Sequence, residues 1–302
     1  MSTTTIIPVT GTFIDGIACD IPSNNWTHKI WTKELEAEKA IGIDTIIFIR
    51  VGWCDSAMYN SKVMQTTLYP KDDLLEFLLS EADRLQLKAF MGLFDTGKYW
   101  LLNEWDEEVD INFRVMDELE ERYLHHPSFQ GWYISHEGDI KFHQEKVWLP
   151  IAKKMRADTP GHKIMISPRY AGVKYEPRFA VPPEIHAKHF DYLYGVMEGN
   201  LDIAAFMDGH VDFRQLPEFL QATKEVSDKH GIEYWSNLET FDRDMPWRFP
   251  PIEWTKMRYK LDAAQKYVKK IITFEAPHFL SHNSCYPAAG HLLDSYLEYL
   301  NQ

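Results

Sequence analysis

A strand-length apolar run followed by a helical stretch recurs eight times along this chain of 302 residues. The runs expected to form strands lie at 10–15, 43–50, 88–95, 129–137, 163–169, 192–198, 233–239 and 270–275. Helices are expected near 29–41, 71–87, 107–124, 143–157, 214–230, 252–269 and 291–300, and a weaker, proline-interrupted helical region follows the fifth strand. Alternating strands and helices are typical of a parallel sheet, and eight such units close a barrel. The sequence therefore predicts an α/β fold of the TIM-barrel type.

We expect one domain over residues 1–302, because no Pro/Gly/Ser-rich linker and no break in composition divides the chain. Gly42, Gly161 and Gly231 each follow an expected helix, where a left-handed cap suits glycine. The length exceeds the roughly 250 residues of a typical (β/α)8 barrel, which indicates enlarged βα loops. A doubly wound sheet is the alternative. No glycine-rich phosphate-binding motif follows any expected strand, so we expect no nucleotide cofactor.

The charge balance limits the partners of the chain. Its 32 Lys and Arg against 45 Asp and Glu give a net charge of −13, which argues against nucleic acid or an anionic membrane as the main partner. No apolar run approaches the roughly 20 residues that span a bilayer, and residues 1–8 lack the features of a signal peptide. We expect a soluble, cytoplasmic protein, or a periplasmic or secreted one if a leader has been removed. The sparse cysteines, Cys19, Cys54 and Cys285, are expected to be reduced thiols.

A charged residue closes every expected strand. In strand order these residues are Asp15, Arg50, Asp95, Glu137, Arg169, Glu198, Glu239 and Glu275. TIM-barrel active sites lie at the carboxyl ends of the strands, so the set is expected to surround one cleft. Any one of these carboxylates could equally cap the following helix, but capping does not require glutamate on four strands. The first and third residues of the set are the weakest candidates, because both stand in ordinary turn sequences.

Two carboxyl groups in a cleft suit glycoside hydrolysis, in which one carboxyl donates a proton and an ionised second one acts as nucleophile or base. Neighbouring negative charges separate the two pKa values without a cofactor. The ten tryptophans support a sugar substrate, since several follow expected strands and sugar rings stack on such side chains. These are Trp26, Trp53, Trp100, Trp105 and Trp247. Each of them alone could equally anchor a long loop.

Four segments carry a resemblance to a known family: Gly11-Thr-Phe-Ile14, Gly131-Trp-Tyr-Ile-Ser-His-Glu137, Trp235-Ser-Asn-Leu-Glu239 and Thr273-Phe-Glu-Ala-Pro-His278. Together they resemble a bacterial family of glycoside-hydrolase-like TIM barrels known as a domain of unknown function. The layout is also similar to that of clan A glycoside hydrolases. This resemblance implies that Glu137 is the acid/base and Glu239 the nucleophile of a retaining mechanism, with carboxyl groups about 5–5.5 Å apart. The residues expected to bind the carbohydrate are Asp15, Trp53, Asp95, His136, Arg169, Glu198, Asn237, Glu275 and His278.

The chain departs from the resembled families at three places. His136 stands where clan A enzymes have asparagine, and Arg50 and Met197-Glu198-Gly199 replace a glutamine and a Gln-Asp-Gly segment. Arg50 and Arg169 could bind an acidic sugar or neutralise the carboxylates. The catalytic pair therefore stays open among the four strand-end glutamates at positions 137, 198, 239 and 275.

Two other functions compete with hydrolysis. A metal-dependent sugar isomerase or epimerase would gather carboxylates and histidine around a divalent ion. No strand supplies a His-x-His pair, so we expect no bound metal; His125, His126 and His162 are expected at the solvated surface, and His278 and His282 near the cleft. A non-catalytic carbohydrate-binding barrel is the second competitor. The sequence does not predict an oligomeric state.

Overall fold

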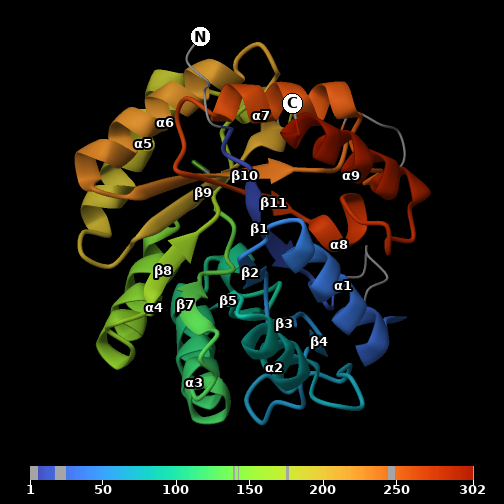
Figure 1. Cartoon of the computed structure of the whole chain (residues 1–302). Helices are drawn as coiled ribbons and strands as arrows, with labels where there is room; N and C mark the ends of the chain where they lie inside the picture. The colour runs from blue at the N-terminus through green and yellow to red at the C-terminus, as the bar shows by residue number, and fades with distance from the viewer. Residues whose placement is uncertain are drawn as a thin grey trace.

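A computed structural model describes residues 6–17, 25–138, 140–141, 143–174, 177–243 and 249–301. Parallel strands close into a barrel in the order β1-β11-β10-β9-β8-β7-β5-β2 (Figure 1). Their bounds are β1 (Val9–Ile14), β2 (Thr45–Phe48), β5 (Lys88–Met91), β7 (Phe129–Tyr133), β8 (Lys163–Ile166), β9 (Ile203–Met207), β10 (Glu233–Glu239) and β11 (Lys270–Phe274). The predicted TIM barrel is confirmed.

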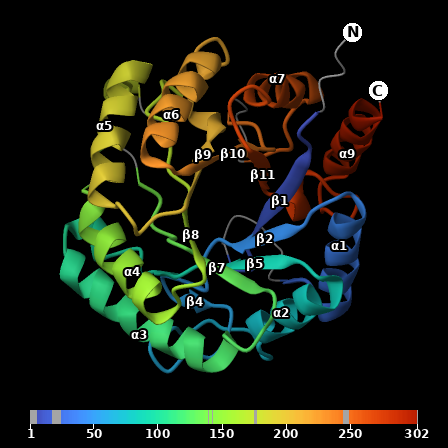
Figure 2. The ribbon, with the colours of Figure 1, turned by 60° about the vertical axis from the view of Figure 1, so that its left-hand side comes forward.

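Helices form a ring outside the strands (Figure 2). Their bounds are α1 (His28–Ala40), α2 (Leu74–Leu85), α3 (Trp105–Tyr123), α4 (Glu145–Asp158), α5 (Pro183–Val196), α6 (Leu216–His230), α7 (Trp254–Ala264), α8 (Ala276–Phe279) and α9 (Pro287–Leu300). Short 3₁₀ turns lie at η2 (Trp100–Leu102), η3 (Pro177–Phe179) and η4 (Asp208–His210). Among the described residues, no helix combines the length and apolarity that crossing a membrane requires.

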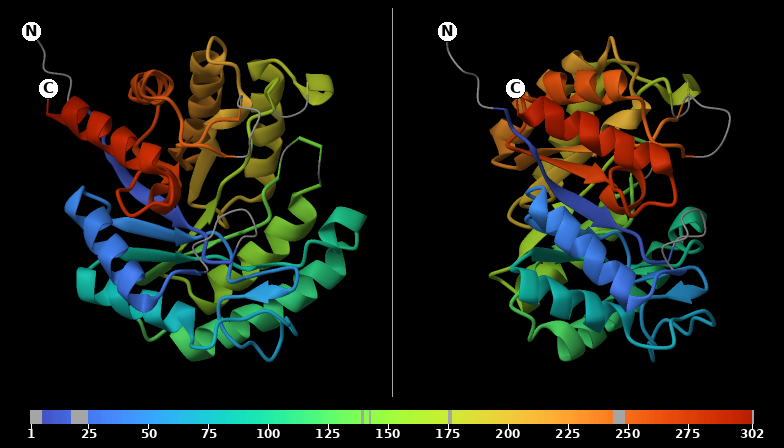
Figure 3. Two further views of the ribbon diagram at one scale, coloured as in Figure 1. Left: turned by 90° about the vertical axis from the view of Figure 1, so that its right-hand side faces the viewer. Right: turned by 45° about the vertical axis from the view of Figure 1, so that its right-hand side comes forward.

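Strand alternation divides the apolar residues between two cores. In β9, Ile203 and Ala205 belong to the core inside the barrel, whereas Ala204 and Phe206 face the helices and join the larger outer core. Both faces of the parallel strands are therefore buried, as expected for a sheet covered by helices. Strand β1 is joined to the helical shell where the Val9 N–H donates to Tyr296 Oη of α9 at 2.7 Å, and Figure 3 shows β1 beside α9.

The expected sixth strand at 192–198 is wrong, since this segment lies at the end of α5 and β9 takes its place in the barrel. The run looks strand-like, but His186, Phe190 and Tyr194 are buried at helical spacing. Glu198 consequently precedes the amino end of β9 and is exposed, so it does not reach the cleft. Asp208 is the residue that follows the sixth strand.

The loops after the second and third barrel strands form a small sheet of their own. It consists of β3 (Gly52–Trp53), β4 (Ser56–Ala57) and β6 (Phe94–Asp95), in the order β4-β3-β6. The strand expected at 43–50 is therefore shortened to β2, and the strand expected at 88–95 is interrupted between β5 and β6. Trp53 and Asp95 are register partners in this sheet, so these two predicted site residues lie beside each other.

Replacing Gly92 by alanine tests this interruption. A Cβ at residue 92 would lie 2.2 Å from the carbonyl oxygen of Phe48, a backbone atom that cannot turn away. We expect Gly92→Ala to lower the free energy of unfolding by about 1–3 kcal/mol in chemical denaturation. Gly161→Ala is the matched control, because nothing lies within 4 Å of its added Cβ. Equal stabilities for the two variants would contradict the close approach of these loops.

Candidate active site

A cavity of about 220 Å³ opens at the carboxyl ends of the barrel strands. Of the site residues predicted from the sequence, Asp15, Trp53, Glu137, Asn237 and Glu239 line it. Its other lining residues are Phe13, Ile49, Arg50, Met207, Phe241, Arg243, Phe249 and Phe274. A larger groove of about 530 Å³ lies between α5 and α6, outside the barrel, and its described lining contains no predicted site residue.

Glu239 ends β10 with its side chain buried and paired to Arg243. The Arg243 Nε and Nη2 atoms each lie 2.7 Å from one of the two carboxylate oxygens. Burial alone would raise the pKa of Glu239, but the charge and hydrogen bonds of Arg243 lower that pKa to about 2. A Cβ on Gly209 would lie 1.6 Å from Glu239 Oε2, so only glycine leaves room for this carboxylate.

A buried ion pair fixes the strand end that carries Glu239. Asp208, directly after β9, accepts a hydrogen bond from the Glu239 N–H at 3.0 Å. Lys260 of α7 donates to Asp208 Oδ1 at 2.7 Å and to the Glu239 carbonyl at 3.0 Å. Burial raises the pKa of Asp208 despite the nearby ammonium. The misplaced sixth strand hid Asp208 from sequence reasoning, and a lysine within an amphipathic helix gives no signal that it is buried.

Glu137 follows β7 and keeps part of its side chain exposed to the cavity. Arg169 Nη2 lies 3.2 Å from Glu137 Oε2, and the Arg169 N–H donates to the Gly138 carbonyl at 3.1 Å. Arg50 and Arg243 line the same cavity as Glu137, and the charge of Glu137 helps to raise the pKa values of both arginines. Arg169 therefore orients Glu137 from outside the described cavity lining, whereas Arg50 and Arg243 belong to that lining.

His136 does not line the cavity, although sequence reasoning assigned it to substrate binding. It is buried, its Nε2 lies 2.7 Å from Glu108 Oε1, and its carbonyl accepts from Trp148 Nε1 at 2.9 Å. His136 therefore connects the Glu137 loop to α3 and α4.

The third strand end is held by a polar network around Asp95. Its Oδ1 accepts from the Gly97 N–H at 2.9 Å and from Trp100 Nε1 at 3.0 Å, and Arg50 Nη1 lies 3.6 Å from Oδ2. The Arg50 guanidinium also lies over the Trp53 ring, 5.2 Å from its centroid. Burial would lower the pKa of Arg50, but the surrounding carboxylates raise it. Arg50 thus stays charged at the wall of the cavity.

The eighth strand end is buried behind the cavity wall. Glu275 Oε2 accepts a hydrogen bond from the Asp15 N–H at 2.9 Å, and its Oε1 lies 2.5 Å from His278 Nδ1. Burial and the negative charge of Asp15 raise the pKa of Glu275 well above its usual range, and burial lowers the pKa of His278 to about 4. Neither side chain is among the described lining residues. Glu275 instead contacts the backbone of Asp15, and Asp15 does line the cavity.

The remaining polar and aromatic candidates from the sequence do not form one group in the structure. Asn237 donates from Nδ2 to Ser167 Oγ at 3.0 Å, while its Oδ1 is buried without a partner among the described residues. Trp26 stacks on His278 rather than facing the cavity. Cys19 and Trp247 lie outside the described residues.

Asp95, Glu108 and His136 place ligand-type atoms within 4.8 Å of one another, as a metal site would require. Their oxygens, however, already face hydrogen-bond donors. Glu108 accepts from the Thr96 N–H at 3.2 Å and faces His136, while Asp95 faces Arg50 and the donors described above. Carboxylates surrounded by N–H groups and a guanidinium favour a hydrogen-bond network rather than a cation site.

The sequence profile of a family described as Domain of unknown function (DUF4434) matches residues 9–286. The chain belongs to this family. A crystal structure from Bacteroides thetaiotaomicron VPI-5482, of a protein proposed to be an alpha-L-fucosidase, is 38% identical with a TM-score of 0.93, over 98% of this chain and 94% of that one. No curated protein matches.

More distant structures share the fold alone. A family 1 β-glucosidase from Thermotoga maritima has a TM-score of 0.59 at 11% identity, over 98% of each chain. An intracellular xylanase from Thermoanaerobacterium saccharolyticum has a TM-score of 0.52 at 10% identity, over 89% of this chain and 85% of that one. The family match confirms the resemblance to a TIM-barrel domain of unknown function that the sequence indicated, and the two distant structures share its fold.

The ion pair between Arg243 and Glu239 gives a prediction that does not depend on the reaction. Arg243→Ala removes the strongest of the interactions that oppose burial, so the pKa of Glu239 should rise from about 2 toward 4.5. In the wild type the lowered pKa stabilises the fold above pH 4.5, and this stabilisation is lost as pH falls toward 2. The variant should lack this part of the pH dependence.

Carboxyl-carbon NMR of Glu239 measures the titration directly. Arg258→Ala is the control, because Arg258 pairs at 3.6 Å with Asp262 on the exposed side of α7. An unchanged titration of Glu239 in Arg243→Ala would show that this ion pair does not set the charge state of the site.

Proposed function

We propose that this DUF4434 protein is a glycoside hydrolase that cleaves a glycosidic bond with retention of configuration. Glu137 is the proposed acid/base and Glu239 the proposed nucleophile. The observation that carries the proposal is that these two carboxylates line one cavity at the carboxyl ends of β7 and β10, the fourth and seventh strands of the barrel. Retaining glycosidases require two carboxyl groups on either side of the scissile bond.

The electrostatics of Glu239 suit a nucleophile. With its pKa lowered to about 2, the carboxylate is ionised at neutral pH and can attack the anomeric carbon. Because Arg243 engages both oxygens, attack requires one oxygen to turn from the guanidinium toward the sugar while the other stays paired. Arg243 then stabilises the carboxylate until its charge is consumed in the ester bond.

Glu137 supplies and recovers the proton. In the first step it protonates the oxygen of the leaving group as the C–O bond breaks and Glu239 bonds to the anomeric carbon. In the second step Glu137 takes a proton from water, and the resulting hydroxide displaces Glu239 from the sugar. Arg169 holds the carboxyl in place at 3.2 Å through both steps.

The walls of the cavity suit a sugar ring with an apolar side. Phe241, Phe249 and Phe274 offer aromatic surface, while Asp15, Arg50 and Asn237 add polar side chains to the lining. The name of the 38% identical relative makes an aryl α-L-fucoside the first substrate to test. A 6-deoxy sugar carries a methyl group that fits the phenylalanine-rich wall.

Separate replacement of the two glutamates tests the roles. We expect Glu137→Gln and Glu239→Gln each to lower kcat for an unactivated glycoside by at least about 100-fold, because each removes one of the two catalytic groups. Glu198→Gln is the control, since Glu198 is exposed and lies away from the cavity. Azide should rescue the alanine variants on activated aryl glycosides, giving a product of inverted configuration for Glu239→Ala and of retained configuration for Glu137→Ala.

NMR of the first-formed sugar decides between the outcomes. Retained configuration supports the proposal. Inverted configuration of the wild-type product would instead show that Glu239 acts as a general base and not as a nucleophile. Hydrolysis that survives both glutamine changes would remove these residues from the mechanism. Saturable sugar binding without turnover by the wild type would identify a carbohydrate-binding barrel, and turnover abolished by chelation would favour the metal-dependent alternative.

A further inference from the structure

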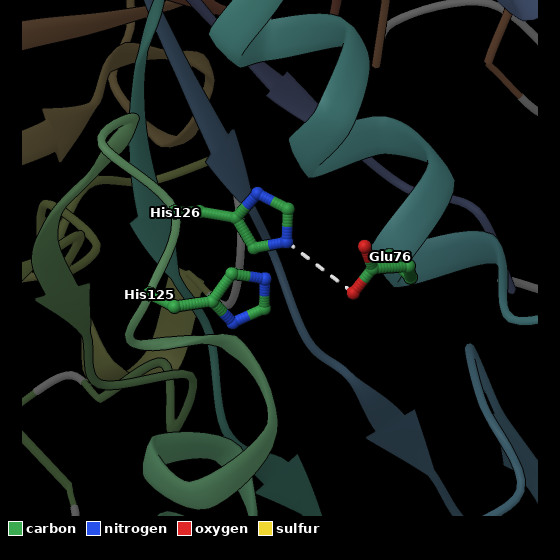
Figure 4. Close-up of side chains that lie close together, drawn as sticks. All are labelled: Glu76, His125 and His126. Carbon is green, nitrogen blue, oxygen red and sulfur yellow. Dashed lines mark hydrogen bonds and ion pairs between the residues drawn. The ribbon is translucent and has the colours of Figure 1, made fainter.

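A second group of ligand-type side chains lies outside the described lining of the catalytic cavity. Glu76 belongs to the first turn of α2, and His125 and His126 follow the end of α3. Figure 4 shows the two imidazole rings close together, with His126 directed toward the Glu76 carboxylate. One ligand atom from each of the three residues lies within 4.8 Å of the other two. His126 lies 50 positions after Glu76 in the chain, so two distant segments present two imidazoles and one carboxylate at a single point.

The ring of His126 is oriented by a second carboxylate. His126 is 5% exposed, against the expectation of a solvated residue, and its Nδ1 lies 2.6 Å from Asp83 Oδ2. Asp83 is held in turn by the Ser128 N–H at 2.8 Å. A carboxylate at that distance accepts a hydrogen bond from Nδ1, so Nε2 is the ring atom that faces Glu76. This carboxylate–histidine arrangement is the one that orients metal-ligating histidines in proteins.

The second ring nitrogen of His126 faces another carboxylate, that of Glu76. Nε2 of His126 lies 3.3 Å from Glu76 Oε2, which is long for a charged N–H···O bond of about 2.7–2.9 Å. Bonds of about 2.0–2.1 Å to one tetrahedral zinc ion would place neighbouring ligand atoms about 3.3–3.4 Å apart. The observed separation of 3.3 Å is compatible with two ligands of one small cation.

We propose that Glu76, His125 and His126 form a binding site for a zinc-class divalent ion, with Asp83 as the positioning residue of His126. His125 is exposed and its ring centroid lies 4.2 Å from that of His126, so it can supply the third bond from the solvent side. Water completes the tetrahedron. The ion would tie the turn between α3 and β7 to α2 and stabilise that side of the barrel.

Zinc titration of chelator-treated full-length protein tests the site by calorimetry and thermal melting. The wild type should bind one zinc ion per chain at this site and gain thermal stability, and Co²⁺ should give the visible spectrum of a tetrahedral complex. His125→Ala and Glu76→Gln change partly or fully exposed side chains, so they spare the core. Each should weaken zinc binding by at least about tenfold, and Asp83→Asn by about 10–100-fold.

His282→Ala is the matched control, because His282 is an exposed histidine that contacts a carboxylate, Asp294, at 2.9 Å. Binding that is unchanged in the double variant Glu76→Gln/His125→Ala would overturn the site, as would a wild type without saturable zinc binding. Circular dichroism of each variant in chelator separates lost ligands from lost folding. The readout is independent of glycoside hydrolysis, so failure of one proposal leaves the other intact.

Discussion

The buried ion pair between Lys260 and Asp208 is the interaction on which the catalytic end of the barrel depends. It joins α7 to the carboxyl ends of β9 and β10, and both of its members also bond to the backbone of Glu239. Removing one partner of such a pair leaves an uncompensated buried charge and costs about 3–5 kcal/mol. Because the Glu239 N–H and carbonyl are both engaged, the ion pair fixes the direction of this side chain before any substrate binds.

Arginine side chains compensate the negative charge of the carboxylates around the cavity. Arg243 faces Glu239, Arg169 faces Glu137, and Arg50 lies near Asp95. A pocket that gathers several carboxylates would otherwise favour protonation of each, because desolvation and mutual repulsion both raise carboxyl pKa values. The arginines allow one carboxylate to remain ionised in a buried setting, as the lowered pKa of Glu239 illustrates. The strand-end charges therefore form paired sets, in place of the simple ring that the sequence suggested.

Sequence reasoning predicted the barrel because its main signal, the alternation of apolar runs with amphipathic helices, reports burial directly. It failed at 192–198, where buried residues of α5 mimic a short strand, and Glu198 was misplaced with it. Features of the site that depend on the packing of distant segments had no local signal. Lys260 lies inside a helix, and Arg243 lies in a loop four residues after its partner.

Single residues were also misread because their partners are remote in sequence. His136 is adjacent to Glu137 but turns toward Glu108, 28 positions earlier. His126 seemed a surface residue because it follows an exposed helix end, yet Asp83 and Glu76 of another helix enclose it. In both cases the sequence shows the residue type but does not show which way the side chain points. That orientation depends on how the helices pack around the barrel.

Trapping the glycosyl-enzyme intermediate tests the central claim most directly. A 2-deoxy-2-fluoro glycoside with a good leaving group slows the second step more than the first, so a covalent ester should accumulate and be found by peptide mass spectrometry. The account predicts one adduct, on the peptide that contains Glu239, and none in Glu239→Gln. An adduct on another carboxylate, or turnover of the probe without any covalent species, would contradict the assignment of Glu239 as the nucleophile.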